Sequence, residues 1–198
     1  MYFVVKRFLD ITLAFIALLL LLPVFIIINI LIFLSSGLPI FYLQERVGKD
    51  WKPFKIIKFR TMIKDADKIG LGITSNSDSR ITPVGKILRK TKLDELPQLI
   101  NVLKGEMSLI GPRPELLKFV NHFKEDYSFI LNIKPGITDY ASIQFRNEET
   151  MIKSVDNESF YLKEILPSKI ALYKKYIREM GLFTDFKILF YTLKGLII

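Results

Sequence analysis

Cysteine is absent from the chain, and histidine occurs once, as His122. The lack of cysteine excludes disulfides, thiolate metal sites and a cysteine nucleophile. No catalytic motif surrounds His122, so it is interpreted as an ordinary surface or core residue. Acidic residues are also few, since 20 Asp and Glu stand against 29 Lys and Arg and give a formal net charge of +9. Half of the residues are hydrophobic, and an oily, basic chain favours an anionic membrane surface or a nucleic acid as partner.

A long apolar stretch without charged residues covers residues 11–34, ITLAFIALLLLLPVFIIINILIFL. As a straight helix it would extend about 36 Å, enough to cross a hydrocarbon core of about 30 Å. Pro23 predicts a kink near its middle, because proline removes a helical N–H and clashes with the preceding turn. Basic residues flank both ends, which favours two cytoplasmic ends. A spanning helix and a re-entrant helix that bends at Pro23 both remain open.

The chain that follows predicts strands within residues 41–60, joined by a turn at 49–50, and then a polar loop over 64–80. Asp65 and Asp67 form a D-x-D pattern in this loop, which is interpreted as solvated loop rather than a metal site. A helix is expected from Pro83 to about Lys90, with Thr82 as its N-cap.

Two amphipathic helices are expected in the C-terminal third, at about 168–180 and 185–197. The pair Thr184-Asp185 predicts the start of the second helix. Its dense mixture of apolar residues and lysine is typical of a helix lying in a membrane interface, but also fits a helix packed on a core.

The segment 92–115, KLDELPQLINVLKGEMSLIGPRPE, holds two adjacent acids. Pro97 fits the first turn of a helix, which places Asp94 near the N-cap and Glu95 in the first turn. Gly105 is expected to end this helix. Capping alone would explain both acids without any catalysis, because carboxylates are favourable at a helix N-terminus.

Arg113 in this segment lies between two prolines, which favour extended backbone around it. A guanidinium held on stiff backbone suits phosphate binding. Further candidate donors are Lys58, Arg60 and Arg89. A carboxylate pair, fixed cations and an apolar segment together suit Mg²⁺-assisted chemistry on a diphosphate whose acceptor lies in the bilayer.

The sequence resembles the small monotopic phosphoglycosyl transferases, a family of bacterial sugar transferases, over nearly its whole length. The matching segments are KRFLD at 6–10, the proline-broken apolar run, QERVG at 44–48, FKIIKFRTM at 54–62, KLDELPQLINVLKGEMSLIGPRP at 92–114, KPGIT at 134–138 and DFKI at 185–188. The long central motif is the most specific of them.

The resemblance implies transfer of a sugar 1-phosphate from a UDP-sugar to a polyprenol phosphate such as undecaprenyl phosphate, with release of UMP. Asp94 would be the nucleophile and form a phosphosugar-aspartyl intermediate, and Glu95 would complete the dyad. Both acids are candidate Mg²⁺ ligands, and whether Glu95 acts in metal binding, positioning or proton transfer stays open. The candidate substrate- and phosphate-binding residues are Lys58, Arg60, Arg89, Arg113, Arg146, Asn147 and Glu148.

The implied fold is α+β and mostly helical, a monotopic membrane protein with a proline-kinked re-entrant helix, amphipathic interfacial helices and a small β element. Residues 1–40 would form the re-entrant helix, and residues 41–198 a catalytic domain on the cytoplasmic face of the bacterial inner membrane. Two positions depart from the family pattern: Leu22 stands where serine is frequent, and Asp139 where glycine is usual.

Two other interpretations are a non-catalytic membrane-anchored scaffold and a basic nucleic-acid-binding protein. The sequence shows no recognisable nucleic-acid motif, and its basic residues flank apolar segments as membrane-surface lysines do. A scaffold would not need an Asp-Glu pair beside a fixed arginine. The expected partners are therefore a UDP-sugar, a polyprenol phosphate and the lipid bilayer, with no nucleic acid.

Overall fold

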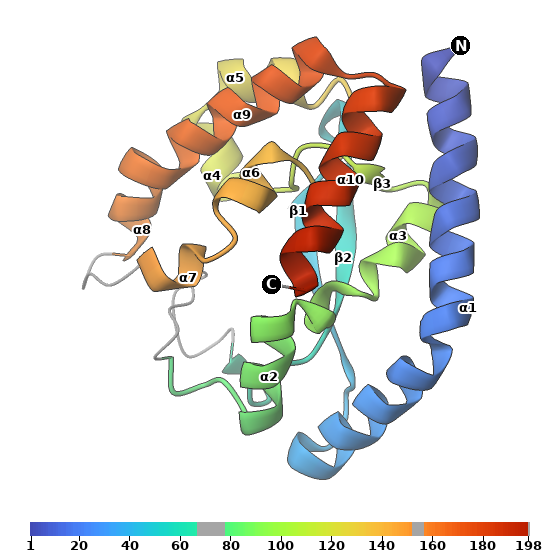
Figure 1. The fold of residues 1–198 in the computed structure, drawn as a ribbon. Coiled ribbons are helices and arrows are strands. Elements are labelled where there is room, and N and C mark those ends of the chain that lie inside the picture. Colours follow the sequence, from blue (N-terminus) through green and yellow to red (C-terminus); the bar gives the residue numbers. More distant parts are fainter. Residues whose placement is uncertain (67–77, 152–156, 198) are drawn as a thin grey trace.

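The computed structural model describes residues 1–66, 78–151 and 157–197, which form a mostly helical chain with two small sheets (Figure 1). The helices are α1 (Tyr2–Ser36), α2 (Pro83–Thr91), α3 (Gln98–Lys104), α4 (Leu117–His122), α5 (Lys124–Ile130), α6 (Tyr140–Gln144), α7 (Glu148–Met151), α8 (Asn157–Phe160), α9 (Leu166–Glu179) and α10 (Leu182–Ile197). The strands are β1 (Phe41–Val47), β2 (Pro53–Phe59), β3 (Ser108–Ile110) and β4 (Gly136–Thr138). Short 3₁₀ turns lie at Lys49–Trp51 and Leu93–Glu95, and a π-helical turn at Tyr161–Ile165 precedes α9.

The predicted strands and turn within residues 41–60 are confirmed as an antiparallel hairpin. Phe41 of β1 pairs with Phe59 of β2, and Val47 pairs with Pro53. Asp50 in the turn has a φ of 55°, a left-handed conformation that aspartate tolerates better than most residues. Alternate residues of β2, Phe54 and Ile56, are buried in the core, which follows from the two-residue period of a strand.

The second sheet brings the GPRP segment against the KPGIT segment. β3 and β4 pair in parallel, with Ser108 opposite Gly136 and Ile110 opposite Thr138. A Cβ on Gly136 would lie 2.1 Å from the backbone nitrogen of Gly111, so only glycine permits this close backbone approach. The contact fixes the backbone that leads to Arg113.

The first half of α1 is held on the domain by polar contacts. The Arg7 guanidinium donates to the carbonyls of Val102 and Leu103, at 2.7 and 3.1 Å, where α3 ends. The buried carboxylate of Asp10 accepts from the Leu109 backbone N–H at 2.9 Å. One turn further on, Ala14 is fully buried against the core beneath α3.

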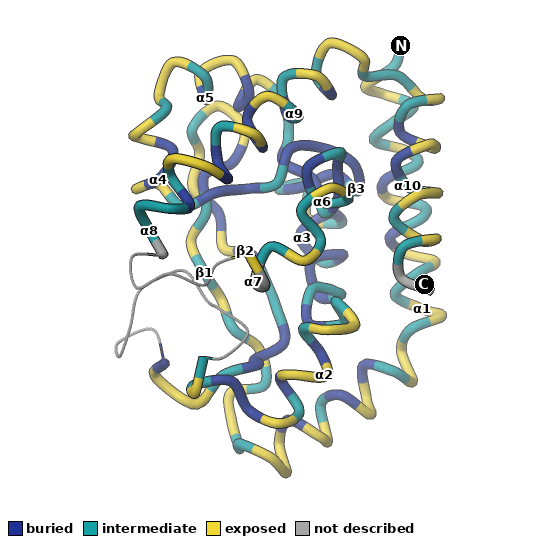
Figure 2. Tube along the Cα trace, turned by 60° about the vertical axis from the view of Figure 1, so that its left-hand side comes forward, coloured by how far each residue is buried: buried dark blue, intermediate teal, exposed yellow. Residues whose placement is uncertain are grey.

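The second half of α1 packs on β2 and α2 through apolar side chains. Phe25, Ile28 and Ile32 are buried against Phe59 and Leu88. α1 runs as one continuous helix through Pro23, and its outward face is exposed along most of its length (Figure 2). It is long and apolar enough to cross a membrane, yet buried positions occur on it from Asp10 to Ile32.

The two C-terminal helices are confirmed with earlier starts than predicted. α10 begins at Leu182, so the prediction that Thr184-Asp185 caps it is wrong. Asp185 lies inside the helix and turns inward, because its carboxylate accepts hydrogen bonds from Tyr2, Lys6 and Tyr176. The opposite side of α10 is strongly exposed and apolar at Phe183, Phe186, Phe190 and Leu193.

Candidate active site

The two adjacent acids lie on the 3₁₀ turn Leu93–Glu95, between α2 and α3. The prediction that Asp94 caps the following helix is wrong, because α3 begins only at Gln98, with Pro97 in the capping position. Lys92 adopts a left-handed φ of 58° and turns the chain sharply into this 3₁₀ turn. The carboxylates are therefore placed by a tight turn and not by a helix end.

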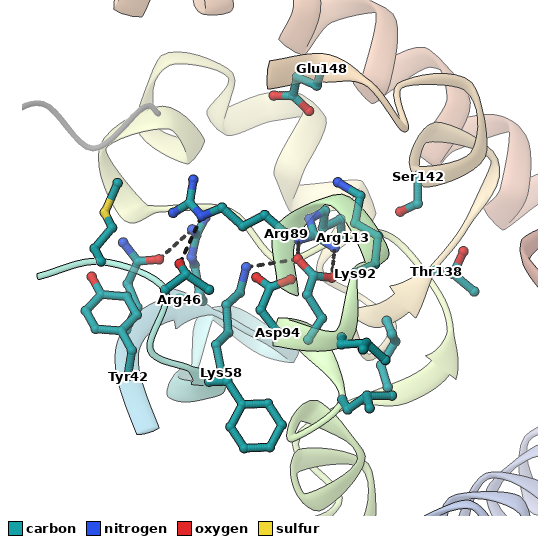
Figure 3. A pocket seen from close by; sticks show the side chains of 18 of the residues that line it. Tyr42, Arg46, Lys58, Arg89, Lys92, Asp94, Arg113, Thr138, Ser142 and Glu148 are labelled. Atoms are coloured by element: carbon teal, nitrogen blue, oxygen red, sulfur yellow. Dashed lines mark hydrogen bonds and ion pairs between the residues drawn. The ribbon is translucent and has the colours of Figure 1, made fainter. Parts of the chain in front are cut away.

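Glu95 is held by two cations. Arg113 donates from Nη1 to Glu95 Oε2 at 2.9 Å and from Nη2 to Oε1, which is the bidentate geometry of a guanidinium on a carboxylate. Lys58 Nζ donates to the same Oε1 at 3.0 Å (Figure 3). Burial alone would raise the pKa of Glu95, but Arg113 and Lys58 hold it well below its usual value. Glu95 is thus a fixed anion.

Asp94 is in the opposite position. Its Oδ1 is buried and has no hydrogen-bond partner. Burial and the neighbouring charge of Glu95 raise the pKa of Asp94 to about 6, against the opposing effect of Lys58 and Arg89. A pair of carboxyl groups whose pKa values are driven apart assigns them different roles. Asp94 therefore keeps an oxygen atom without a partner, and it is still largely ionised at neutral pH.

The predicted phosphate-binding cations are only partly brought together. Lys58, Arg89 and Arg113 line the cavity around Asp94, and Arg89 Nε donates to Thr61 Oγ1 at 2.9 Å. Arg60 also borders the cavity, but its Nη2 donates to the carbonyls of Ser36 and Gly37, at 2.6 and 2.7 Å. Its guanidinium therefore fastens the end of α1.

The three candidates near residue 147 lie in the part of the chain that leads into α7. Arg146 and Glu148 line the cavity, whereas Asn147 between them is exposed and does not line it. Glu148 forms an ion pair with Lys169 at 2.6 Å. Of the D-x-D pattern, Asp65 lies at the border of the cavity, and Asp67 is outside the described residues.

The cavity has a volume of about 1340 Å³ and contains two chemically different regions. The dyad region consists of Lys58, Arg89, Asp94, Glu95 and Arg113. The hydroxyl region consists of Thr138, Ser142, Tyr173 and Thr192, which come from β4, α6, α9 and α10. Figure 3 shows Thr138 and Ser142 to the right of the dyad region and Glu148 above it.

Sequence reasoning missed the hydroxyl region and a buried network beside it. Tyr161 Oη donates to Glu115 Oε1 at 2.6 Å and accepts from Lys169 Nζ at 3.3 Å. Glu115 and Tyr161 are 46 residues apart, so no local pattern could have indicated their contact. Tyr161 lies on a π-helical turn, a feature that is frequent at functional sites. This turn can be recognised in the structure but not in the sequence.

Asp139, the departure from the family pattern, is fully buried and caps α6. Its Oδ1 accepts from the Ser142 backbone N–H at 2.7 Å, and its Oδ2 has no partner. Burial raises the pKa of Asp139 to about 6, although the hydrogen bonds from Ser142 and the charges of Arg113 and Lys169 oppose this. The residue therefore fixes the position of Ser142.

A metal ion would have few protein ligands here. Within residues 1–66, 78–151 and 157–197, no three His, Asp or Glu side chains are grouped to hold one. Both oxygens of Glu95 are bonded to cations, which leaves Asp94 Oδ1 as the carboxylate oxygen without a partner. Mg²⁺ commonly uses one or two carboxylates together with substrate phosphates, so this arrangement fits it.

Comparison with known proteins agrees with the central motif. A family model described as bacterial sugar transferase matches residues 1–198. An Aeromonas hydrophila UDP-N-acetylgalactosamine-undecaprenyl-phosphate N-acetylgalactosaminephosphotransferase is 40% identical over 82% of this chain and 40% of its own length. A putative undecaprenyl-phosphate N-acetylgalactosaminyl 1-phosphate transferase of Bacillus subtilis is 48% identical over 63% of this chain and 70% of its own.

An Escherichia coli UDP-glucose:undecaprenyl-phosphate glucose-1-phosphate transferase is 39% identical over 97% of this chain and 40% of its own length. The chain thus spans less than half the length of the A. hydrophila and E. coli relatives. Because the family match covers the whole chain, including the turn with Asp94 and Glu95, the chain belongs to the bacterial sugar transferase family.

Proposed function

We propose that the protein transfers a sugar 1-phosphate from a UDP-sugar to undecaprenyl phosphate and releases UMP. The names of its relatives support a sugar-phosphate transfer to this lipid. The observation that carries the proposal is the division between the two acids: Glu95 is bonded to Arg113 and Lys58, while Asp94 keeps a buried oxygen without a partner. This arrangement supplies a nucleophile beside cations suited to a diphosphate.

In the first step, a carboxylate oxygen of Asp94 attacks the β-phosphorus of the UDP-sugar. A bond forms between this oxygen and the β-phosphorus, and the bond from the β-phosphorus to the bridging oxygen breaks, so that UMP leaves with its electron pair. A pKa near 6 makes Asp94 more basic than an ordinary carboxylate while leaving it mostly ionised at neutral pH. Arg89, Lys58 and Arg113 line the same cavity and would stabilise the phosphoryl charge.

In the second step, a phosphate oxygen of undecaprenyl phosphate attacks the phosphorus of the aspartyl intermediate. The acyl-phosphate bond to Asp94 breaks, the carboxylate is regenerated, and a lipid diphosphate-sugar leaves. The cavity of about 1340 Å³ exceeds the usual range of about 300–1,000 Å³ for small-molecule sites. Its size leaves room for a donor and for the phosphate end of the acceptor.

Mg²⁺ is part of the proposal as the ion that offsets the charge of the diphosphate when bound. Asp94 is the residue that would hold it together with phosphate oxygens, since both Glu95 oxygens are engaged. Glu95 then acts as the residue that fixes Arg113 and Lys58 in place.

The proposed location is the cytoplasmic face of the bacterial inner membrane, with both ends of α1 on that side. Both halves of α1 contact the catalytic domain, at Ala14 in the first and Phe25, Ile28 and Ile32 in the second. A helix that crosses the whole bilayer would lose its contacts with the domain in the far leaflet. Here both halves of α1 keep such contacts. The exposed apolar residues of α1 and α10 would face lipid in a single leaflet.

The reaction is tested with purified protein, Mg²⁺, undecaprenyl phosphate and a panel of UDP-sugars. The expected products are UMP and a lipid diphosphate-sugar. Incubation with donor alone should give a sugar-phosphate adduct in intact-mass spectrometry, mapped to Asp94. Release of UDP instead of UMP would contradict the proposed reaction, and an adduct on Glu95 would reverse the roles of the acids.

The topology is tested with single cysteines at Val4 and at Lys49, since the chain has none of its own. Val4 is 74% exposed, so its replacement disturbs little packing. In intact cells neither cysteine should react with a membrane-impermeant thiol reagent, and both should react after lysis. Labelling of one site in intact cells would establish a spanning helix.

A further inference from the structure

The four side chains of the hydroxyl region differ in how their hydroxyl groups are bonded. Thr192 Oγ1 donates to the Ile188 carbonyl at 2.9 Å and lies 2.8 Å from Thr138 Oγ1. These two threonines therefore satisfy each other. Ser142 Oγ and Tyr173 Oη are buried and make no hydrogen bond of good geometry, although the Ser142 hydroxyl lies near enough to the Asp139 carboxylate to lower its pKa. Both residues line the cavity, and Tyr173 is fully buried.

A buried hydroxyl group without a partner destabilises the fold, because it has lost its bonds to water and gained nothing in exchange. Where two such groups line one cavity, a ligand in that cavity can supply the missing bonds. The positions of both side chains are fixed by the fold. Asp139 Oδ1 accepts the Ser142 backbone N–H at 2.7 Å, and Tyr173 on α9 packs into the buried core.

The surroundings indicate a neutral ligand rather than a phosphate. Burial and the charges of Asp139 and Glu115 raise the pKa of Tyr173 well above its usual value, against the opposing charge of Arg113. A further anion is less favourable beside these two carboxylates than in the dyad region, where the gathered cations suit the diphosphate. A group rich in hydroxyls can both donate to and accept from Ser142, Tyr173 and the threonine pair.

We propose that the hydroxyl region holds the sugar of the donor, and that Ser142 Oγ and Tyr173 Oη are the atoms that contact its hydroxyl or amide substituents. This assignment rests on the proposed function, since it takes the diphosphate to lie in the dyad region. It makes Ser142 and Tyr173 determinants of sugar specificity, contributed by α6 and α9 from outside the central motif.

The test compares two variants with two matched controls in the full-length protein. Tyr173→Phe and Ser142→Ala remove the unpartnered hydroxyl groups of the cavity. Tyr127→Phe and Ser108→Ala remove hydroxyl groups that are also buried and unpartnered but do not line the cavity. All four should keep the wild-type thermal midpoint within a few degrees or exceed it, because no protein hydrogen bond is lost.

Kinetics with saturating undecaprenyl phosphate then separate the pairs. Tyr173→Phe and Ser142→Ala should each lower kcat/KM for the UDP-sugar up to about tenfold, the size expected for the net loss of one hydrogen bond to a substrate. Their ranking of UDP-sugars that differ at one hydroxyl or acetamido group should also change. Tyr127→Phe and Ser108→Ala should stay within twofold of the wild type in both respects.

Inhibition by UMP identifies which part of the donor is bound. UMP has no sugar beyond its ribose, so its inhibition constant should be unchanged in Tyr173→Phe and Ser142→Ala. A parallel weakening of UMP would place the nucleoside in the hydroxyl region and overturn the assignment, as would variants that behave like their controls. A wild-type chain that releases no UMP from any UDP-sugar would instead contradict the proposed function itself.

Discussion

The dyad region and the hydroxyl region border one cavity, yet they are built in opposite ways. In the dyad region nearly every charge has a partner: Arg113 and Lys58 are bonded to Glu95, and Arg89 to Thr61. In the hydroxyl region two buried hydroxyl groups have none. In the dyad region, charged groups therefore hold one another in position. In the hydroxyl region, the two hydroxyl groups are left to bond with a ligand.

The difference also concerns the distance along the chain. Arg89, Asp94, Glu95 and Arg113 all lie within residues 89–113, and only Lys58 is added from the more distant strand β2. The hydroxyl region needs β4, α6, α9 and α10, so it exists only when the whole C-terminal half is packed. Substitutions in the dyad region should therefore affect the rate more than the fold, and the reverse holds for the residues that support the hydroxyl region.

Asp94→Asn should have the largest effect. The amide keeps the shape of the side chain but is no nucleophile, so UMP release should fall by on the order of 10³-fold or more. The thermal midpoint should not fall, because the variant removes a buried charge that has no partner at Oδ1. The measurement is single-turnover UMP release alongside intact-mass detection of the adduct. Substantial turnover without an adduct would remove the distinction between Asp94 and Glu95.

Arg113→Lys should have the next largest effect. Lysine keeps the positive charge but loses the two-pronged contact with Glu95, so the cation is no longer oriented. We expect kcat to fall by about 10²-fold, the loss typical of removing one positioned charge-stabilising donor. The exposed Arg178 on α9 gives the control Arg178→Lys, which should be neutral. Equal activity of Arg113→Lys and wild type would show that charge alone is sufficient.

Unlike the two substitutions in the dyad region, Lys169→Met should lower the stability of the fold more than the rate. Lys169 is buried between Glu148 and the Tyr161 hydroxyl, beside the hydroxyl region. Loss of one partner of a buried ion pair costs about 3–5 kcal/mol, and we expect about 2 kcal/mol because Glu148 can turn toward water. Thermal unfolding in detergent measures this. Glu148→Gln should cost at least as much, since it leaves the buried ammonium group of Lys169 without its anion, and a clearly smaller cost would show that the Tyr161 hydroxyl is sufficient to hold this charge.

The same contrast explains how much the sequence could predict. The hairpin, the Thr82 cap, the end of α3 at Gly105 and the two C-terminal helices follow from local patterns, and the structure confirms them. Asp94 as a helix cap and Asp185 as part of a capping pair were wrong, because left-handed Lys92 and the donors Tyr2, Lys6 and Tyr176 impose contacts from outside those patterns. Tyr173 and Ser142 could not be predicted at all, since their common feature is a missing partner, which only the packed chain reveals.

Asp139→Asn should have the smallest effect, visible as a change in pH dependence. Asp139 is buried beside the hydroxyl region. The charges of Arg113 and Lys169 lower its pKa, and its own charge raises the pKa of Tyr173. Its pKa is about 6 in the folded chain against an ordinary value of 3.8, so the folded chain binds the proton more tightly than the unfolded chain. The contribution of this carboxyl group to stability is therefore greatest at low pH and is lost as the pH rises toward and through 6.

The asparagine has no proton to lose in this range and can still accept the Ser142 N–H that caps α6. Relative to the wild type, the variant should therefore become more stable as the pH rises from 5 to 8, by about 1–2 kcal/mol. The difference between the unfolding midpoints of the two proteins is taken at each pH. Groups that titrate alike in both proteins, including Asp94 and Glu95, drop out of this difference. The amide also adds a buried donor where Oδ2 has no partner, which shifts the difference by a constant and leaves its slope unchanged. A difference independent of pH would show that Asp139 is charged throughout this range and that Arg113 and Lys169 outweigh its burial.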